Sequence, residues 1–263
     1  MPTIADIASA LEAFAPLHLQ EDYDNAGLLV GDSWAECTGV LLTVDVSPDT
    51  VHEAVAAGCN LIVSHHPLIF RGLKHLTGAS KVEKAVIDAI RSDVAIYAAH
   101  TNLDNASGGV SAEMARMLGL VDVSPLQPIA GEPDTVGCGA IGHLAAPLSA
   151  YDLVQKVKST FGSPIARCDE FDTARTITTV ALCGGSGAFL IPEAIKAGAE
   201  AFVTSDVKYH DFVDYAGRIL IVDIGHHESE NCSKNIFYHI ITEKFPNFAV
   251  RYSQCDTNPI IYL

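Results

Sequence analysis

The sequence predicts an α/β protein built of two related domains with mainly parallel sheets, and three observations lead to this prediction. Residues 40–66 resemble residues 180–206 at a constant offset. Each copy alternates short apolar runs with a helical pattern, as βαβ units do. The chain has 263 residues, of which 49% are apolar, which is enough to form two modest hydrophobic cores.

The N-terminal segment predicts an amphipathic helix rather than a signal peptide. Its apolar residues recur at helical spacing: Ile4, Ile7, Leu11 and Phe14. Asp6 and Glu12 lie among them, and a positively charged start is missing. Because no 18 apolar residues follow one another, we expect no membrane span. Seven cysteines without a CxxC motif indicate reduced thiols in a cytoplasmic protein.

The repeat defines the elements that follow. In VLLTVDVSPDTVHEAVAAGCNLIVSHH and VALCGGSGAFLIPEAIKAGAEAFVTSD, an apolar strand leads through a loop into a helix. Gly58 and Gly198 stand where that helix should end, and a second strand comes next. Each copy therefore predicts two parallel strands joined by a right-handed crossover.

A second correspondence extends the repeat. AIYAAHTNLD, at 95–104, aligns with IVDIGHHESE, at 221–230, which sets His100 and Asp104 opposite His226 and Glu230.

Three prolines within 122–135 suggest a domain limit there, and residues 233–263 suggest a helix and closing strands. We therefore expect a first domain of residues 1–124 plus about 232–263, and a second domain of residues 125–231.

Candidate metal ligands follow the predicted strands, where parallel sheets collect functional side chains. They are His65 and His66, His100 and Asp104, Asp206, and His226, His227 and Glu230. Imidazoles and carboxylates without a thiolate suit zinc, iron, manganese, cobalt or nickel. A carboxylate that bridges two ions ~3.5–4 Å apart is a common arrangement.

Structural interpretations remain open beside this one. Adjacent histidines can face solvent at a strand end, His226 and Glu230 can form a helix-surface ion pair, and Asp104 can start a helix. CGGSG, at 183–187, can cradle an anion or form a tight turn. YDNAGLLVGD, at 23–32, fits a turn and an edge strand.

The charge of the chain excludes some partners. It carries 32 acidic and 16 basic residues, a formal charge of −16, so duplex nucleic acid and anionic membrane surfaces are repelled. Small ligands, metals and proteins fit better.

Six ordered blocks now support a family resemblance. They are YDNAGLLVGD, VDVSPDTVHEAVAAGCNLIVSHHPLIF, YAAHTNLDNASGGVS, VALCGGSG, FVTSDVKYHDFVDYA and GHHESE. From about residue 20 onward, the chain resembles the GTP cyclohydrolase 1 type 2 homolog family, or NIF-three-like proteins, in its short bacterial form. The resemblance implies a toroidal homohexamer, a trimer of dimers, with two divalent ions in each subunit.

The same resemblance implies roles for individual residues. His66 and Asp104 would hold one ion, His65 and His226 the other, and Glu230 would bridge both. His100 and His210 would transfer protons near the metals.

The activity implied is the opening of the guanine ring of GTP, in which a metal-activated hydroxide attacks C8 and formate is released. A triphosphate needs cations, and Arg71, Lys74 and Lys208 are the candidates. Two alternatives stay open: a metal-dependent hydrolase of another small substrate, and a non-enzymatic hexamer that binds metal or serves as a scaffold.

Overall fold

The computed structural model describes residues 1–169, 174–255 and 257–263. Two compact units make up the chain. Unit 1 comprises Met1–Leu103 and Ser233–Pro259, and unit 2 comprises Asp104–Cys232 and Ile260–Leu263. Each unit is an α/β structure with its own sheet.

The sheet of unit 1 is parallel except at one edge. Its strand order is β1-β4-β3-β2-β11, with β1 (Gly27–Val30), β2 (Val40–Thr43), β3 (Leu61–Ser64), β4 (Ala95–Ala98) and β11 (Val250–Tyr252). Strand β1 lies at one edge of the sheet, as expected, and runs antiparallel to β4. The other pairs are parallel. The closing strand β11 lies beside β2 and completes this sheet.

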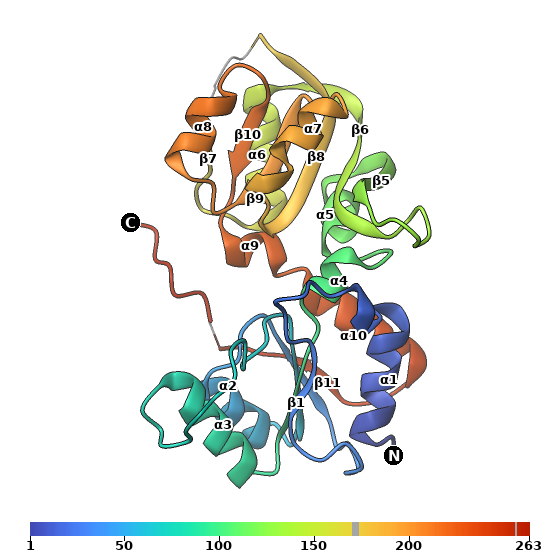
Figure 1. Ribbon diagram of the computed structural model, residues 1–263, viewed down its shortest axis with the longest axis vertical. Coiled ribbons are helices and arrows are strands. Elements are labelled where there is room, and N and C mark those ends of the chain that lie inside the picture. Colours follow the sequence, from blue (N-terminus) through green and yellow to red (C-terminus); the bar gives the residue numbers. More distant parts are fainter. Residues whose placement is uncertain (170–173, 256) are drawn as a thin grey trace. The chain divides into compact units, whose positions relative to one another are not determined.

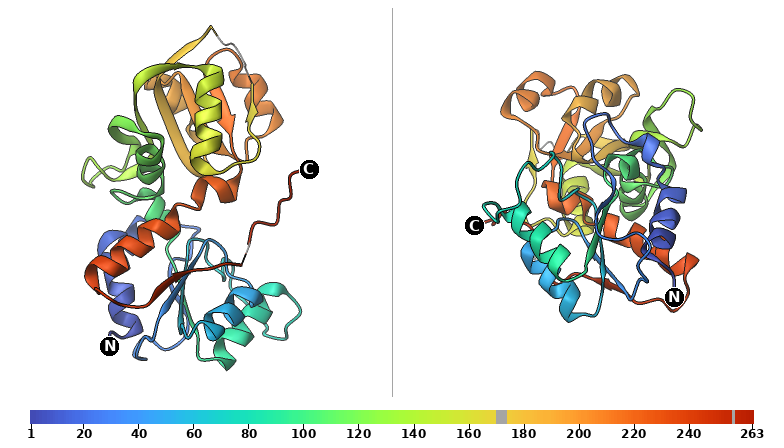
Figure 2. Two further views of the ribbon diagram at one scale, coloured as in Figure 1. Left: turned by 180° about the vertical axis from the view of Figure 1, so that it is seen from behind. Right: turned by 60° about the horizontal axis from the view of Figure 1, so that its bottom comes forward.

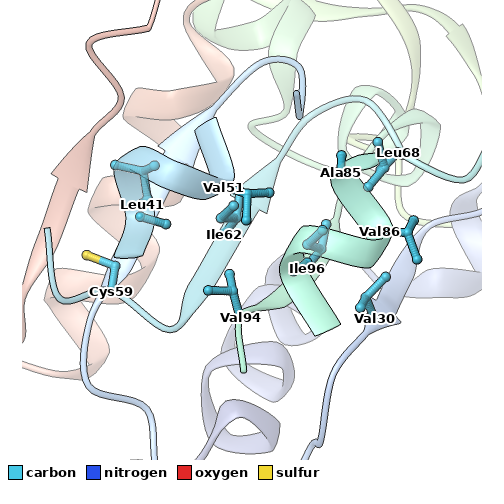
Figure 3. Close-up of a cluster of buried hydrophobic side chains, with 12 residues drawn as sticks. Val30, Leu41, Val51, Cys59, Ile62, Leu68, Ala85, Val86, Val94 and Ile96 are labelled. Atoms are coloured by element: carbon cyan, nitrogen blue, oxygen red, sulfur yellow. The ribbon is translucent and has the colours of Figure 1, made fainter. Parts of the chain in front are cut away.

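Helices cover both faces of this sheet (Figure 1). The helices and short turns of unit 1 are α1 (Ile4–Phe14), η1 (Leu17–Leu19), α2 (Pro48–Ala56), α3 (Lys81–Arg91) and α10 (Ser233–Lys244). Figure 3 shows the buried cluster at α2 and α3, which includes Val51 and Val86 of the helices and Ile62 and Ile96 of the strands. Helices α1 and α10 contact each other, and α10 also contacts β2.

The sheet of unit 2 is mixed. Its order is β5-β6-β8-β9-β10-β7, with β5 (Leu120–Pro128), β6 (Gly137–Ser149), β7 (Arg167–Cys168), β8 (Thr176–Ser186), β9 (Ala201–Ser205) and β10 (Leu220–Asp223). The pairs β8–β9 and β9–β10 are parallel. The pairs β5–β6, β6–β8 and β10–β7 are antiparallel. The proline-containing segment thus forms an edge strand, a position that tolerates the missing N–H groups.

The helices of unit 2 lie on both faces of its sheet. They are α5 (Val110–Leu118), α6 (Ala150–Phe161), η2 (Ala188–Leu190), α7 (Ile191–Lys196), α8 (Tyr209–Tyr215) and α9 (His226–Glu230). Figure 2 (left) shows α6 in front of the sheet with α7 and α8 behind it.

The β2–α2–β3 segment of unit 1 and the β8–α7–β9 segment of unit 2 confirm the two predicted βαβ units. Gly58 and Gly198 have φ of +70° and +81°, the left-handed values expected where these helices end.

Unit 2 begins earlier than the domain limit suggested by composition. Its first residue is Asp104, inside helix α4 (Thr101–Asn105), rather than residue 125. Helix α5 contacts β5, β6 and β8, so packing assigns it to the second unit. Among the described residues, no helix is both long and apolar enough to cross a membrane.

Glu53 fastens the segment that follows β11. Its carboxylate accepts hydrogen bonds from Ser253 Oγ, the Gln254 N–H and the Cys255 N–H, at 2.5, 2.7 and 3.3 Å. Burial alone would raise the pKa of Glu53, but these hydrogen bonds outweigh it and lower the pKa below 4.5. A group with a lowered pKa stabilises the fold above its unfolded-state pKa and loses this effect as the pH falls through the folded one.

We therefore expect Glu53→Gln to reduce the hydrogen-exchange protection of the Gln254 and Cys255 amides at pH 7. Wild-type protection should fall toward that of the variant as the pH drops below about 4.5, the unfolded-state value of a glutamate. Exchange followed by NMR measures both effects, with the exposed Glu243→Gln as control. Equal protection in the variant and the wild type at pH 7 would show that Glu53 does not hold the segment after β11.

Candidate metal centre

Three histidines gather at two neighbouring strand ends of unit 1. His65 and His66 follow β3, and His100 follows β4. Their ring centroids lie 5.1–5.4 Å apart. One nitrogen from each ring lies within 4.8 Å of the others, so the three could hold a metal ion. The spacing results from the parallel β3–β4 pairing, which places both carboxyl ends at one edge.

An oxygen atom orients each of the three rings. The Nδ1–H groups donate from His65 to Ala99 O, from His66 to Asp45 Oδ1 and from His100 to Asp24 Oδ1, at 3.0, 2.7 and 2.8 Å. A carbonyl or carboxylate can only accept, so Nδ1 carries a proton, and in the neutral imidazole the lone pair is then on Nε2. Protein metal sites use this arrangement to present Nε2 to the ion.

Asp24 is a buried support for His100. Its second oxygen accepts from the Thr101 N–H and Thr101 Oγ at 3.0 and 2.5 Å. Burial alone would raise the pKa of Asp24, but hydrogen bonds from His100 and Thr101 hold it well below its ordinary range. The carboxylate is therefore ionised and acts only as an acceptor.

In unit 2, helix α9 carries a histidine and a carboxylate one turn apart. His226 Nε2 lies 3.0 Å from Glu230 Oε2, and His226 Nδ1 donates to Asp206 Oδ2 at 2.6 Å. With the proton on Nδ1, both Nε2 and Oε2 present lone pairs, so a positive ion or a second proton must lie between them. About 3 Å also separates two ligand atoms of one ion at bond lengths of 2.0–2.2 Å. The pair thus fits a divalent metal.

Asp223 links the loops that carry Asp206 and His226. It is buried at the end of β10 and accepts hydrogen bonds from the Val207 N–H at 2.9 Å and the Gly225 N–H at 3.1 Å. These amides adjoin Asp206 and His226 respectively. Arg167 also donates to Asp223. The loops after β9 and β10 are therefore held by one carboxylate.

Asp104 and Glu230 each raise the pKa of the same two thiols of unit 2, those of Cys183 and Cys232. The pKa of Cys183 is raised well above its usual value by contact with Cys138, by burial and by these two carboxylates. Burial raises the pKa of Cys232 as well, and the same carboxylates add to the effect. Asp104 and Glu230 thus contribute negative charge to one region of unit 2, where a cation is favoured.

The CGGSG segment forms the backbone wall beside Glu230. Ser205 Oγ and Thr204 Oγ donate to Gly185 O at 2.5 and 3.1 Å, and the Gly185 N–H donates to Ser229 Oγ at 2.9 Å. A Cβ at Gly185 would collide with the Glu230 carboxylate. Residues 183–186 belong to the end of strand β8, whose pairing with β9 shifts register between Leu182 and Ser186. The expected tight turn is therefore an irregular strand end, and close approach to Glu230 is the reason for glycine at position 185.

The remaining candidates lie at exposed positions. Arg71 and Lys74 are in the loop after β3, and Lys208 and His210 are at the start of α8. His210 packs its ring edge-on against Tyr209. The roles expected for these four residues stay predictions.

Two cavities of unit 2 adjoin candidate ligands. One of 370 Å³ has Asp104, Ser111 and Arg116 in its wall. The other, of 210 Å³, is lined by His226 together with Tyr262 of the C-terminal segment. The sequence offered no signal for Tyr262, because only the return of the chain to unit 2 brings it there.

Asp206 was among the candidates named from the sequence, and the structure places it against His226 Nδ1. Two other carboxylates that orient rings were missed: Asp45, two residues after β2, and Asp24, which precedes the edge strand β1. A search for carboxylates within two residues of each strand end would have found Asp45.

Comparison with known proteins decides the family. The family model of Duf34/NIF3 (NGG1p interacting factor 3) matches residues 2–259. The chain belongs to the DUF34/NIF3 family. A GTP cyclohydrolase 1 type 2 homolog of Lactococcus lactis is 36% identical over 263 residues, which covers 97% of this chain and 98% of that protein.

Solved structures of family members share the fold. A hypothetical protein of Staphylococcus aureus superposes with a TM-score of 0.91 at 27% identity, covering 99% of both chains. A Bacillus cereus protein related to NIF3 gives 0.90 at 24% identity, covering 100% of this chain and 99% of that one. The resemblance stated from the sequence blocks is thereby confirmed, as is the α/β fold class with two sheets.

Asp206 provides a test of ring orientation. We expect Asp206→Asn to weaken metal binding about 10-fold or more, since loss of a carboxylate partner typically costs 10–100-fold. Asparagine also tolerates the left-handed φ of +54° at this position. Isothermal titration with Zn²⁺ or Mn²⁺ measures the affinity, and the exposed Asp214→Asn is a control. An unchanged affinity would remove Asp206 from the site.

Proposed function

We propose that this DUF34/NIF3 member binds two divalent ions and uses them to hydrolyse a small substrate. One observation carries the proposal: Nδ1 of His65, His66, His100 and His226 each lies within hydrogen-bond distance of an oxygen, which fixes the ring orientation and places the lone pair of the neutral ring on Nε2. The proposed ligands are those expected from the sequence: His66 and Asp104 for one ion, His65 and His226 for the other, and Glu230 for both.

The donor set suits the chemistry. Imidazoles and carboxylates favour zinc, iron, manganese, cobalt or nickel, and such ions supply Lewis acidity and activate water. His100 is proposed to move a proton at Nε2, because Asp24 holds its Nδ1–H. Arg71, Lys74 and Lys208 are proposed to attract an anionic substrate.

The substrate proposed first is GTP, with opening of the guanine ring and release of formate. The name of the Lactococcus relative supports this choice. The experiment is metal analysis of the purified protein followed by a turnover assay in which formate release from GTP is measured. We expect two ions per chain and metal-dependent formate release.

Variants in each unit separate the parts of the proposal. His65→Ala in unit 1 and Glu230→Gln in unit 2 should each lower the metal content. Metal binding without formate release, but with metal-dependent turnover of another substrate, would reject GTP and keep the hydrolase. A protein that retains no metal after loading with each of the five ions would reject the proposal. The homohexamer expected from the resemblance stays a prediction, which native mass spectrometry checks.

A further inference from the structure

Two exposed aromatic rings lie beside the histidine cluster of unit 1. Tyr23 is 65% exposed and Phe70 is 43% exposed. Their ring centroids are 6.3 Å apart with an interplanar angle of 55°. Phe70 is also 6.3 Å from the ring of His100, at 78°. The pair therefore lies beside His100, at the edge of the histidine cluster.

Part-buried hydrogen bonds join the two loops that carry these rings. Asn25 Nδ2 donates to Ile69 O at 2.6 Å, which joins the loop of Tyr23 to the loop of Phe70. Asp24, next to Tyr23, binds both His100 and Thr101. The loops of Tyr23 and Phe70 are thus joined to each other, and the Asp24 contacts that orient the imidazole of His100 also tie the loop of Tyr23 to it.

We propose that Tyr23 and Phe70 bind the planar heteroaromatic ring of a nucleotide, and this inference rests on the proposed function. Both residues are exposed to solvent, and exposed aromatic side chains can stack on any base because every base has a π-face. Arg71 follows Phe70 directly, and Lys74 lies in the same exposed loop, so phosphate is attracted nearby. A ring held on Phe70 lies next to His100, the proposed proton carrier.

Two small ligands, one with and one without a heteroaromatic base, test whether Tyr23 and Phe70 bind that base. Guanosine 5′-monophosphate and ribose 5-phosphate share the sugar phosphate, and isothermal titration of the metal-loaded protein gives both Kd values. We expect the nucleotide to bind about 10-fold more tightly, in the lower part of the range for stacking on an aromatic side chain. Tyr23→Leu or Phe70→Leu should remove most of this difference without changing the metal content. Phe189→Leu, which replaces a 65% exposed ring in unit 2, should leave it intact.

Equal Kd values for the two ligands on wild type, or no binding of either, would overturn the inference. So would a ring preference that survives both leucine variants. If these variants instead alter the oligomeric state in analytical ultracentrifugation and keep the ring preference, the pair is a contact between proteins and the inference fails. Because metal content is measured separately, a failure here leaves the proposed metal-dependent function standing.

Discussion

Glu230→Gln is expected to cost most of the metal and nearly all of the turnover. The Glu230 side chain is only 4% exposed and lies 3.0 Å from His226 Nε2. A neutral amide keeps the size of the side chain but removes the negative charge and one strong donor oxygen. Loss of a proposed direct ligand should exceed the 10–100-fold effect of losing an outer partner. Metal content by mass spectrometry and turnover at saturating metal measure the two effects.

Glu193→Gln is the matched control for this variant. Glu193 lies on α7 of the same unit, where it forms an exposed ion pair with Lys196. Such pairs contribute little, so the control should bind metal and turn over substrate as the wild type does. If Glu230→Gln retained two ions per chain and full turnover, Glu230 would be a structural residue and the proposed site would lose its shared ligand.

Gly185→Ala is expected to weaken both the fold and the metal site. Gly185 has φ of +61°, and a left-handed alanine costs roughly 1–2 kcal/mol. An added Cβ would also collide with the Glu230 carboxylate and lie 3.3 Å from His226 Cε1. We therefore expect a loss of about 1–3 kcal/mol in the free energy of unfolding, together with weaker metal binding. Urea denaturation and metal titration measure these effects.

Gly198→Ala separates backbone strain from collision. Gly198 has φ of +81°, but nothing lies within 4 Å of its Cβ position. This variant should show the cost of the left-handed conformation alone and keep the metal affinity of the wild type. Equal metal affinities for the two alanine variants would show that Gly185 serves only the backbone conformation at the end of β8.

The order of elements was predictable because local patterns encode it. The repeat correctly predicted β2–α2–β3 and β8–α7–β9, since each strand is a short apolar run and each helix ends at a glycine. The antiparallel strands of unit 2 were not predicted. In β5, Pro125 and Pro128 resemble a linker, and only pairing with β6 makes the segment a strand.

The sequence by itself determined the two-unit α/β plan and the histidines that follow its strands, because apolar periodicity and strand ends are local properties of the chain. Only the tertiary structure decided how those histidines are oriented. Asp24 reaches His100 across 76 residues of sequence, and Asp45 reaches His66 across 21. Such contacts depend on strand order and loop paths, and no spacing rule within the sequence specifies them. The same reason explains why the pairing of Tyr23 with Phe70 became visible only in the folded chain.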